Sequence, residues 1–226
     1  MIVYANSDSY GVCSTGKTYV DFIGNALGAD KIINAGLGGS CNQRIFRTSV
    51  RDLLELKKQN RDVLVLIGLG NPARSELWTV RPQGNDGHFK SFQPNSTELF
   101  TTTEQNYVKN WYMLADDEAM TTNLYFMLTM FTTFLESNGF RYLIWAGPMI
   151  YKPVDFAAPF IESFSNIVHN NSNILDLYNF SFSKYCSIIK KHVPYDESQF
   201  GMHGHHAELA HKDFADYIVK TYLNEI

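Results

Sequence analysis

Short, strongly apolar segments alternate along this chain with segments of helical length, and this alternation restricts the fold more than any other feature. Residues 63–68 open with five consecutive aliphatic side chains, which is typical of a strand buried on both faces of a sheet. The other segments predicted as strands are residues 2–5, 31–34, 142–146 and 174–177. The segments predicted as helices are residues 18–27, 40–59, 104–138, 155–169, 181–192 and 207–223.

Strands that alternate with helices predict a parallel sheet with helices on both faces. We therefore expect an α/β fold, a three-layer α/β/α sandwich of flavodoxin-like type around a mostly parallel, five-stranded sheet. The 226 residues are predicted to form one domain, residues 1–226. Residues 72–105 are rich in Gly, Pro, Asn, Ser and Thr, so we expect a loop insertion there.

Composition excludes several classes of protein. The 19 Lys and Arg residues are fewer than the 23 Asp and Glu residues, which gives a net charge of −4, so no basic field favours nucleic acid or an anionic membrane. The most apolar segment, residues 124–135, is too short to cross a bilayer, and no basic, apolar leader begins the chain. These features predict a cytoplasmic protein, with a virion or export without a signal peptide left open, and they do not predict the oligomeric state.

Polar residues suited to acyl transfer follow the predicted strands. Ser9 lies just after the first strand, Gly39 in a glycine-rich turn after the second, and Asn71 after the third, while His205 precedes the last helix. A serine nucleophile needs a base, and the tetrahedral oxyanion needs preorganised N–H donors. Ligands bind parallel sheets beyond the carboxyl ends of the strands, so these residues are expected to meet there.

The order of these blocks resembles the SGNH hydrolases, the GDSL esterase and lipase family. Ser7-Asp8-Ser9 is similar to the Gly-Asp-Ser block, residues 34–40 to the glycine block, Gly70-Asn71 to the asparagine block, and His205 with His211 to the histidine block. The resemblance implies that Ser9 is the nucleophile and His205 the base. It also implies an oxyanion hole formed by Ser9, Gly39 and Asn71.

The chain departs from this family at several positions. Ser7 replaces a glycine, Pro72 an aspartate and His206 a proline, while Met202 and His203 stand where the aspartate of the triad is expected. Asp196, Glu197 or His203 is predicted to orient His205 instead. Asp8, Arg74 and Trp78 are predicted to contact the substrate.

The sequence therefore predicts a serine esterase without a cofactor, acting on small acyl esters, among them acetyl groups on carbohydrate. One alternative is an SGNH-like binding or structural protein with weak or no activity, such as a virion or glycan-recognition component. A second is a nucleotide-binding protein, because residues 11–18 match the P-loop pattern. The histidines at 203, 205, 206 and 211 lack a recognised zinc spacing, so no metal is predicted.

Overall fold

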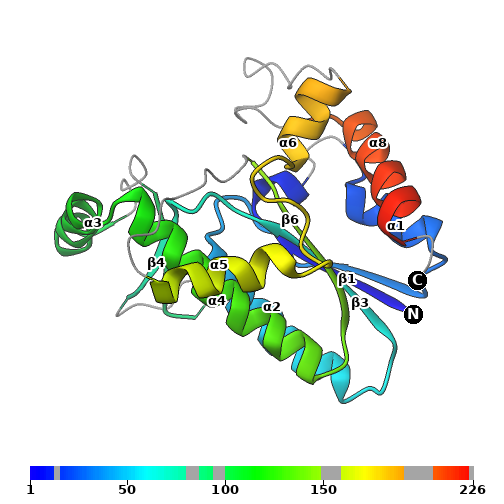
Figure 1. Ribbon diagram of the computed structural model, residues 1–226, viewed down its shortest axis with the longest axis horizontal. Helices are drawn as coiled ribbons and strands as arrows, with labels where there is room; N and C mark the ends of the chain where they lie inside the picture. The colour runs from blue at the N-terminus through cyan, green and yellow to red at the C-terminus, as the bar shows by residue number, and fades with distance from the viewer. Residues whose placement is uncertain (13–15, 80–86, 94–99, 149–158, 191–205, 224–226) are drawn as a thin grey trace.

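The computed structural model describes residues 1–12, 16–79, 87–93, 100–148, 159–190 and 206–223. Its main sheet has four parallel strands in the order β2-β1-β3-β6 (Figure 1). These strands are β1 Ile2–Ser7, β2 Lys31–Asn34, β3 Val63–Leu69 and β6 Arg141–Ala146. The chain runs from β1 to β2 and then returns past β1 to β3, so the strand order reverses between β1 and β3.

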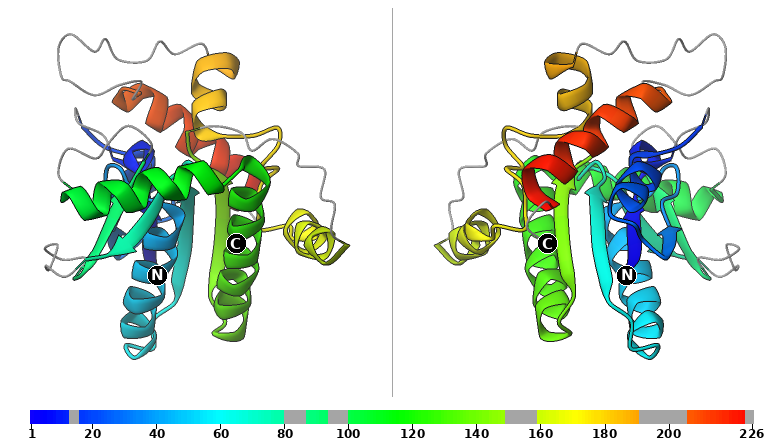
Figure 2. Two further views of the ribbon diagram at one scale, coloured as in Figure 1. Left: turned by 90° about the vertical axis from the view of Figure 1, so that its left-hand side faces the viewer. Right: turned by 90° about the vertical axis from the view of Figure 1, so that its right-hand side faces the viewer.

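Helices cover both faces of this sheet, which confirms the three-layer α/β/α sandwich (Figures 1 and 2). On one face, helices α2 (Asn42–Lys57) and α4 (Asp117–Ser137) pack on the side chains of Tyr4, Val65 and Ile67. On the other face, helices α1 (Tyr19–Ala26) and α8 (Glu208–Ile218) pack on Val3, Leu64 and Trp145. Every residue of β1 and β3 is buried, as the continuous apolar run of β3 predicts.

The helices are α1 Tyr19–Ala26, α2 Asn42–Lys57, α3 Thr102–Leu114, α4 Asp117–Ser137, α5 Pro159–Asn170, α6 Phe182–Lys184 and α8 Glu208–Ile218. A turn of π-helix follows α6 at Tyr185–Ile189, and another follows α8 at Val219–Leu223. The single helix expected over residues 104–138 is wrong. The Asp116 side chain accepts a hydrogen bond from the N–H of Ala119 and starts α4 as a separate helix.

The expected fifth strand at residues 174–177 is also wrong. Ile174 forms only an isolated parallel bridge with Ile144, and the Leu175 N–H donates to the Ile144 carbonyl at 2.8 Å. The Asp176 carboxylate then accepts hydrogen bonds from the N–H groups of Tyr178 and Asn179. This Asx turn bends the chain away from β6, and the chain meets β6 again only at a second isolated bridge, between Ser181 and Ala146.

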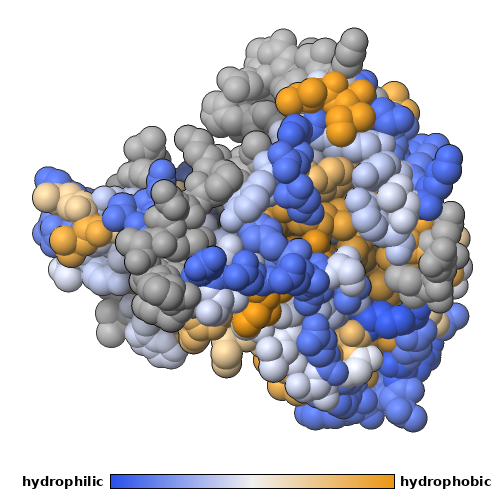
Figure 3. All heavy atoms as spheres, viewed as in Figure 1, coloured by the Kyte–Doolittle hydropathy of each residue, from blue (hydrophilic) through white to orange (hydrophobic). Residues whose placement is uncertain are grey.

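The expected loop insertion at residues 72–105 contains ordered structure. Strands β4 Ser75–Trp78 and β5 Phe89–Phe92 form an antiparallel pair, and Phe92 packs with Phe100 and Val108 of α3 in a small separate core. Figure 3 shows apolar spheres over α3, where Met113 and Leu114 are 73% and 86% exposed.

No helix in the described ranges is long and apolar enough to cross a membrane.

Asn42, the first residue of α2, joins this helix to the end of β3. The Gly70 N–H donates to Asn42 Oδ1 at 2.8 Å, and Asn42 Nδ2 donates to the Gly70 carbonyl at 3.3 Å. Asn42 is 2% exposed. This pair of bonds fixes the loop before α2 against the residues that follow β3.

Replacing Asn42 with Ala is therefore expected to lower the free energy of unfolding by roughly 2 kcal/mol, because two buried hydrogen bonds are lost. Urea unfolding followed by circular dichroism measures this change. Gln59→Ala, at an exposed position just beyond α2, serves as the control and should change stability little. Equal stability of the two variants would contradict the structural role of Asn42.

Candidate functional site

Ser9 lies just beyond the end of β1, at the start of the short 3-10 helix η1 Ser9–Gly11. Its side chain is half-buried, whereas that of Ser7, the last residue of β1, is 2% exposed. Ser7 Oγ donates to the Asp8 carbonyl at 3.1 Å and also hydrogen-bonds the buried Tyr19 hydroxyl. Of these two serines, only Ser9 has access to a ligand.

The loop after β2 lies beside Ser9. The Leu37 N–H donates to the Ser7 carbonyl at 3.1 Å, and a Cβ placed on Gly38 would lie 3.9 Å from the Ser9 Cβ. Gly39 is exposed and has a φ of 77°, a left-handed conformation that favours glycine. The loop thus presents main-chain groups next to the predicted nucleophile.

Asn71 follows β3 at the same end of the sheet. Its Oδ1 accepts a hydrogen bond from the Ala73 N–H at 2.8 Å, which orients the amide and leaves its NH2 group as a donor. The bonds between Asn42 and Gly70 hold this segment against the Ser40 loop, since a Cβ on Gly70 would come within 3.0 Å of the Ser40 carbonyl oxygen. Ser9, Gly39 and Asn71 therefore lie on three neighbouring connections at the carboxyl edge.

Asp8 occupies the point where the strand order reverses, and it is completely buried. Its Oδ1 accepts a hydrogen bond from the Tyr10 N–H at 3.1 Å. Its Oδ2 lies 3.2 Å from Nη1 of Arg74. Full burial is incompatible with the expected substrate contact of Asp8, so its carboxylate acts within the protein.

Trp78, another expected substrate contact, lies on the hairpin. The residue is 65% exposed, and its ring stacks on His88 with 4.7 Å between the ring centroids. Trp78 is not among the residues that line the cavity described below, so its contact with substrate stays a prediction.

His205, Asp196, Glu197 and His203 lie outside the described residues, so the base and its orienting group stay predictions. The next residue, His206, is 3% exposed, and its Nε2 lies 3.5 Å from Ser187 Oγ. His211 Nδ1 accepts a hydrogen bond from the Tyr19 N–H at 3.2 Å. Since α1 is the helix that follows β1, its first residue, Tyr19, lies at the carboxyl edge of the sheet, and this bond places the first turn of α8 there as well.

The geometry around residues 16–21 does not favour the P-loop interpretation. The Thr18 N–H and hydroxyl both donate to the Asp21 carboxylate, at 2.8 and 2.9 Å. The Glu208 carboxylate packs against Gly16, where any Cβ would overlap it. Acidic groups therefore occupy the helix N-terminus at which a P-loop binds phosphate.

Within the described ranges, no group of three or more His, Cys, Asp and Glu side chains is arranged to hold a metal ion. The buried thiols of Cys41 and Cys186 are free, and burial raises the pKa of both, to about 11 and about 12. These two thiols are therefore neutral and poor nucleophiles near pH 7.

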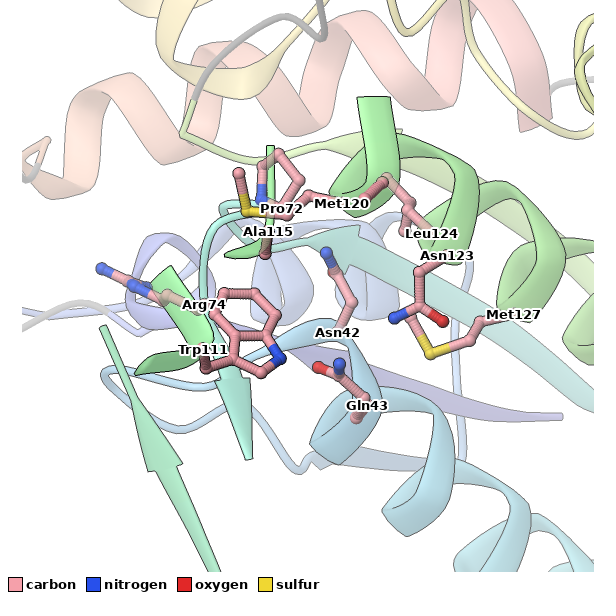
Figure 4. A pocket seen from close by; sticks show the side chains of 11 residues that line it. Asn42, Gln43, Pro72, Arg74, Trp111, Ala115, Met120, Asn123, Leu124 and Met127 are labelled. Atoms are coloured by element: carbon pink, nitrogen blue, oxygen red, sulfur yellow. The ribbon is translucent and has the colours of Figure 1, made fainter. Parts of the chain in front are cut away.

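A cavity of ≈ 210 Å³ lies between the start of α2, the segment after β3, and helices α3 and α4 (Figure 4). Figure 4 shows the Trp111 ring and the Asn42 and Gln43 amides facing this space, whereas the Arg74 guanidinium extends away from it. The lining residues are Asn42, Gln43, Pro72, Arg74, Trp111, Ala115, Ala119, Met120, Asn123, Leu124 and Met127. Ser9 is not one of them.

Most of the residues that line this cavity were not predicted from the sequence. Asn42 follows Gly39 by three residues, at the predicted start of a helix. Its proximity to the predicted site could therefore have been inferred from the sequence. Trp111 and the residues of α4 carry no motif, and only tertiary packing brings them to the segment after β3.

The fold and the strand-end residues define a parallel, doubly wound α/β protein with a polar site at its carboxyl edge. The family model of DUF6071, a family of unknown function, matches residues 11–154. The chain belongs to this family. The match begins just after Ser9 and includes Gly39, Asn71 and Arg74.

No curated protein matches the sequence. Among solved structures, the acetyl xylan esterase AlAXEase has a TM-score of 0.45 at 16% identity, with 98% of this chain and 100% of that chain covered. Axe2, an acetylxylan esterase from Geobacillus stearothermophilus, has a TM-score of 0.44 at 14% identity, with 97% and 92% covered. A catalytic mutant of Axe2 has a TM-score of 0.47 at 14% identity, with the same coverage.

Burial dominates the electrostatics of Asp8. Removal from water raises the pKa of this carboxyl from its ordinary value of 3.8 to about 6, although the Tyr10 N–H and the Arg74 guanidinium act in the opposite direction. A folded-state pKa above the unfolded-state value means that folding favours the protonated acid. The stability associated with Asp8 is therefore present below about pH 3.8 and is lost as the pH rises through about 6.

Asp8→Asn removes this ionisation and retains an acceptor for the Tyr10 N–H. Relative to wild type, the variant is expected to gain up to about 3 kcal/mol of unfolding free energy between pH 4 and pH 7.5. Urea denaturation at a series of pH values measures the difference. A difference that does not change with pH would show that Asp8 has the same pKa in the folded and unfolded states.

Proposed function

We propose that this protein is a serine ester hydrolase with Ser9 as its nucleophile. The observation that carries the proposal is the position of Ser9, a half-buried serine beside Gly38 at the carboxyl edge of the sheet. The exposed glycine loop and Asn71 follow the adjacent strands at that edge. Such an arrangement supplies a nucleophile and the N–H donors that an oxyanion requires.

In the proposed reaction, Ser9 Oγ attacks the ester carbonyl while His205 takes its proton. The N–H groups of Ser9 and Gly39 and the NH2 group of Asn71 stabilise the oxyanion. His205 then protonates the leaving alcohol. Water next attacks the acyl-enzyme while His205 takes its proton, and His205 returns that proton to Ser9 as the acid is released. Asp196, Glu197 or His203 orients the imidazole, and the reaction uses no metal or cofactor.

The cavity next to Asn71 supports a small polar alcohol, such as a carbohydrate, as the other half of the ester. Its volume of ≈ 210 Å³ is below the ~300–1,000 Å³ of sites for drug-sized ligands. Gln43 Oε1 is buried and makes no hydrogen bond with the described residues, so it is available to accept one from a ligand hydroxyl. The Trp111 ring offers an apolar face on the same cavity.

A second candidate is a protein that binds the same class of ligand without hydrolysing it. The specific observation in its favour is the sequence at Met202 and His203, where the aspartate of a complete triad would stand. The two candidates share the cavity and differ in whether Ser9 reacts.

Ser9→Ala is expected to abolish hydrolysis of short-chain aryl esters, because the nucleophilic oxygen is removed. Ser7→Ala is the matched control, since it removes a neighbouring hydroxyl that faces Tyr19 inside the protein. The control is expected to retain most of the activity. Spectrophotometric assays of both variants, with circular dichroism to verify folding, measure the outcome.

Inactivity of Ser7→Ala together with activity of Ser9→Ala would move the nucleophile to residue 7. Inactive wild-type protein that still binds a carbohydrate ester would favour the second candidate.

Asn71→Ala is expected to lower kcat by about 10²-fold with little change in KM, because an oxyanion donor acts mainly on charge that develops in the transition state. Steady-state kinetics with an aryl acetate measure both parameters. A change in KM alone would assign Asn71 to substrate binding instead.

A further inference from the structure

A buried ion pair connects the Ser9 turn with the wall of the cavity. The Asp8 side chain is completely buried, and that of Arg74 is 18% exposed. Asp8 lies directly before Ser9, and its other carboxylate oxygen accepts the Tyr10 N–H. One carboxylate therefore binds the main chain on the far side of Ser9 and the guanidinium of Arg74 at the same time.

Arg74 reaches this carboxylate from a different part of the molecule. Its side chain lines the cavity beside Trp111 and Asn42, and its guanidinium extends away from that space (Figure 4). Its Nε donates to Gln93 Oε1, just after β5, at 3.0 Å. Arg74 thus contacts the cavity, the hairpin and the Ser9 turn.

Close main-chain packing confines the Asp8 carboxylate. A Cβ on Gly70 would lie 3.4 Å from the Asp8 Cβ, and one on Gly147 would lie 3.3 Å from Asp8 Oδ1. The carboxylate therefore has little room to rotate. A buried carboxylate without its cation would also be costly.

We propose that Asp8 and Arg74 are a positioning pair: Arg74, held at the cavity wall, fixes the orientation of the Ser9 turn through the Asp8 carboxylate. The inference rests on the proposed function for the role of Ser9. Neither residue of the pair touches the reacting atoms. The pair acts on the rate at which Ser9 reacts, and Arg74 acts on ligand affinity as well because it lines the cavity.

The experiment measures how fast a fluorophosphonate ester modifies Ser9, as a maximal rate and a half-saturating concentration. Asp8→Asn is expected to lower the maximal rate by about 10²-fold with little change in half-saturation. Arg74→Gln should lower the rate similarly and also raise the half-saturating concentration. The double variant should be no slower than the single variants, because both remove the same interaction.

Arg47→Gln is the matched control. Arg47 forms a two-bond ion pair with Glu76 of β4, at 3.1 and 2.9 Å, so it also joins the hairpin to the main body without contacting the Ser9 turn. This variant should lose stability and keep the wild-type rate of modification. Arg74→Lys, which retains the charge, should recover part of the rate lost in Arg74→Gln.

Two results would overturn the positioning pair while Ser9 remains the nucleophile. One is a double variant in which the losses of rate of the two single variants multiply, and the other is a loss of rate in Arg47→Gln equal to that in Arg74→Gln. If wild-type Ser9 is not modified at all, the proposed function fails, and hydrogen exchange then decides the inference separately. The Tyr10 amide should exchange faster in Arg74→Gln than in wild type or Arg47→Gln. Equal exchange in all three proteins would overturn the pair.

Discussion

The rest of the structure depends on the complete burial of β1 and β3 at the centre of a parallel sheet. Two strands covered on both faces leave no place for functional side chains along their length. In a parallel sheet of this kind, ligands bind beyond the carboxyl ends of the strands, near the point where the strand order reverses. Ser9, Gly39 and Asn71 all lie on connections that leave the strands at this edge, so the packing of the core determines where the site can form.

Holding these connections together requires polar contacts inside the protein. Asn42 joins the start of α2 to Gly70 through two hydrogen bonds, and Asp8 joins the Ser9 turn to Arg74. Burial raises the pKa of Asp8 to about 6, so its ionised form is kept at a cost in stability. A cost of this kind is typical of residues that serve a site more than the fold.

The parts of the fold predicted from sequence are those set by local patterns. The apolar run of β3 and the periodicity of α2 were sufficient to predict these two elements. In contrast, the turn made by Asp176 interrupts the strand expected at residues 174–177, and Asp116 divides one expected helix into two. The hairpin β4–β5 was missed because it lies in a segment rich in Gly, Pro, Asn, Ser and Thr and because its side chains Leu77 and Phe92 pack with residues of α3 that are distant in sequence. Likewise, the turn residue Ser9 could be identified from sequence, but the burial of Asp8 and the cavity at Trp111 depend on contacts distant in sequence.

A crystal structure of the protein after reaction with a small phosphonate ester would test the assignment of Ser9 as the nucleophile. We expect a covalent bond from phosphorus to Ser9 Oγ. We also expect the phosphonyl oxygen to lie ~2.7–3.1 Å from the Ser9 and Gly39 nitrogens and Asn71 Nδ2. An adduct on another residue, or a phosphonyl oxygen directed away from Gly39 and Asn71, would contradict this assignment.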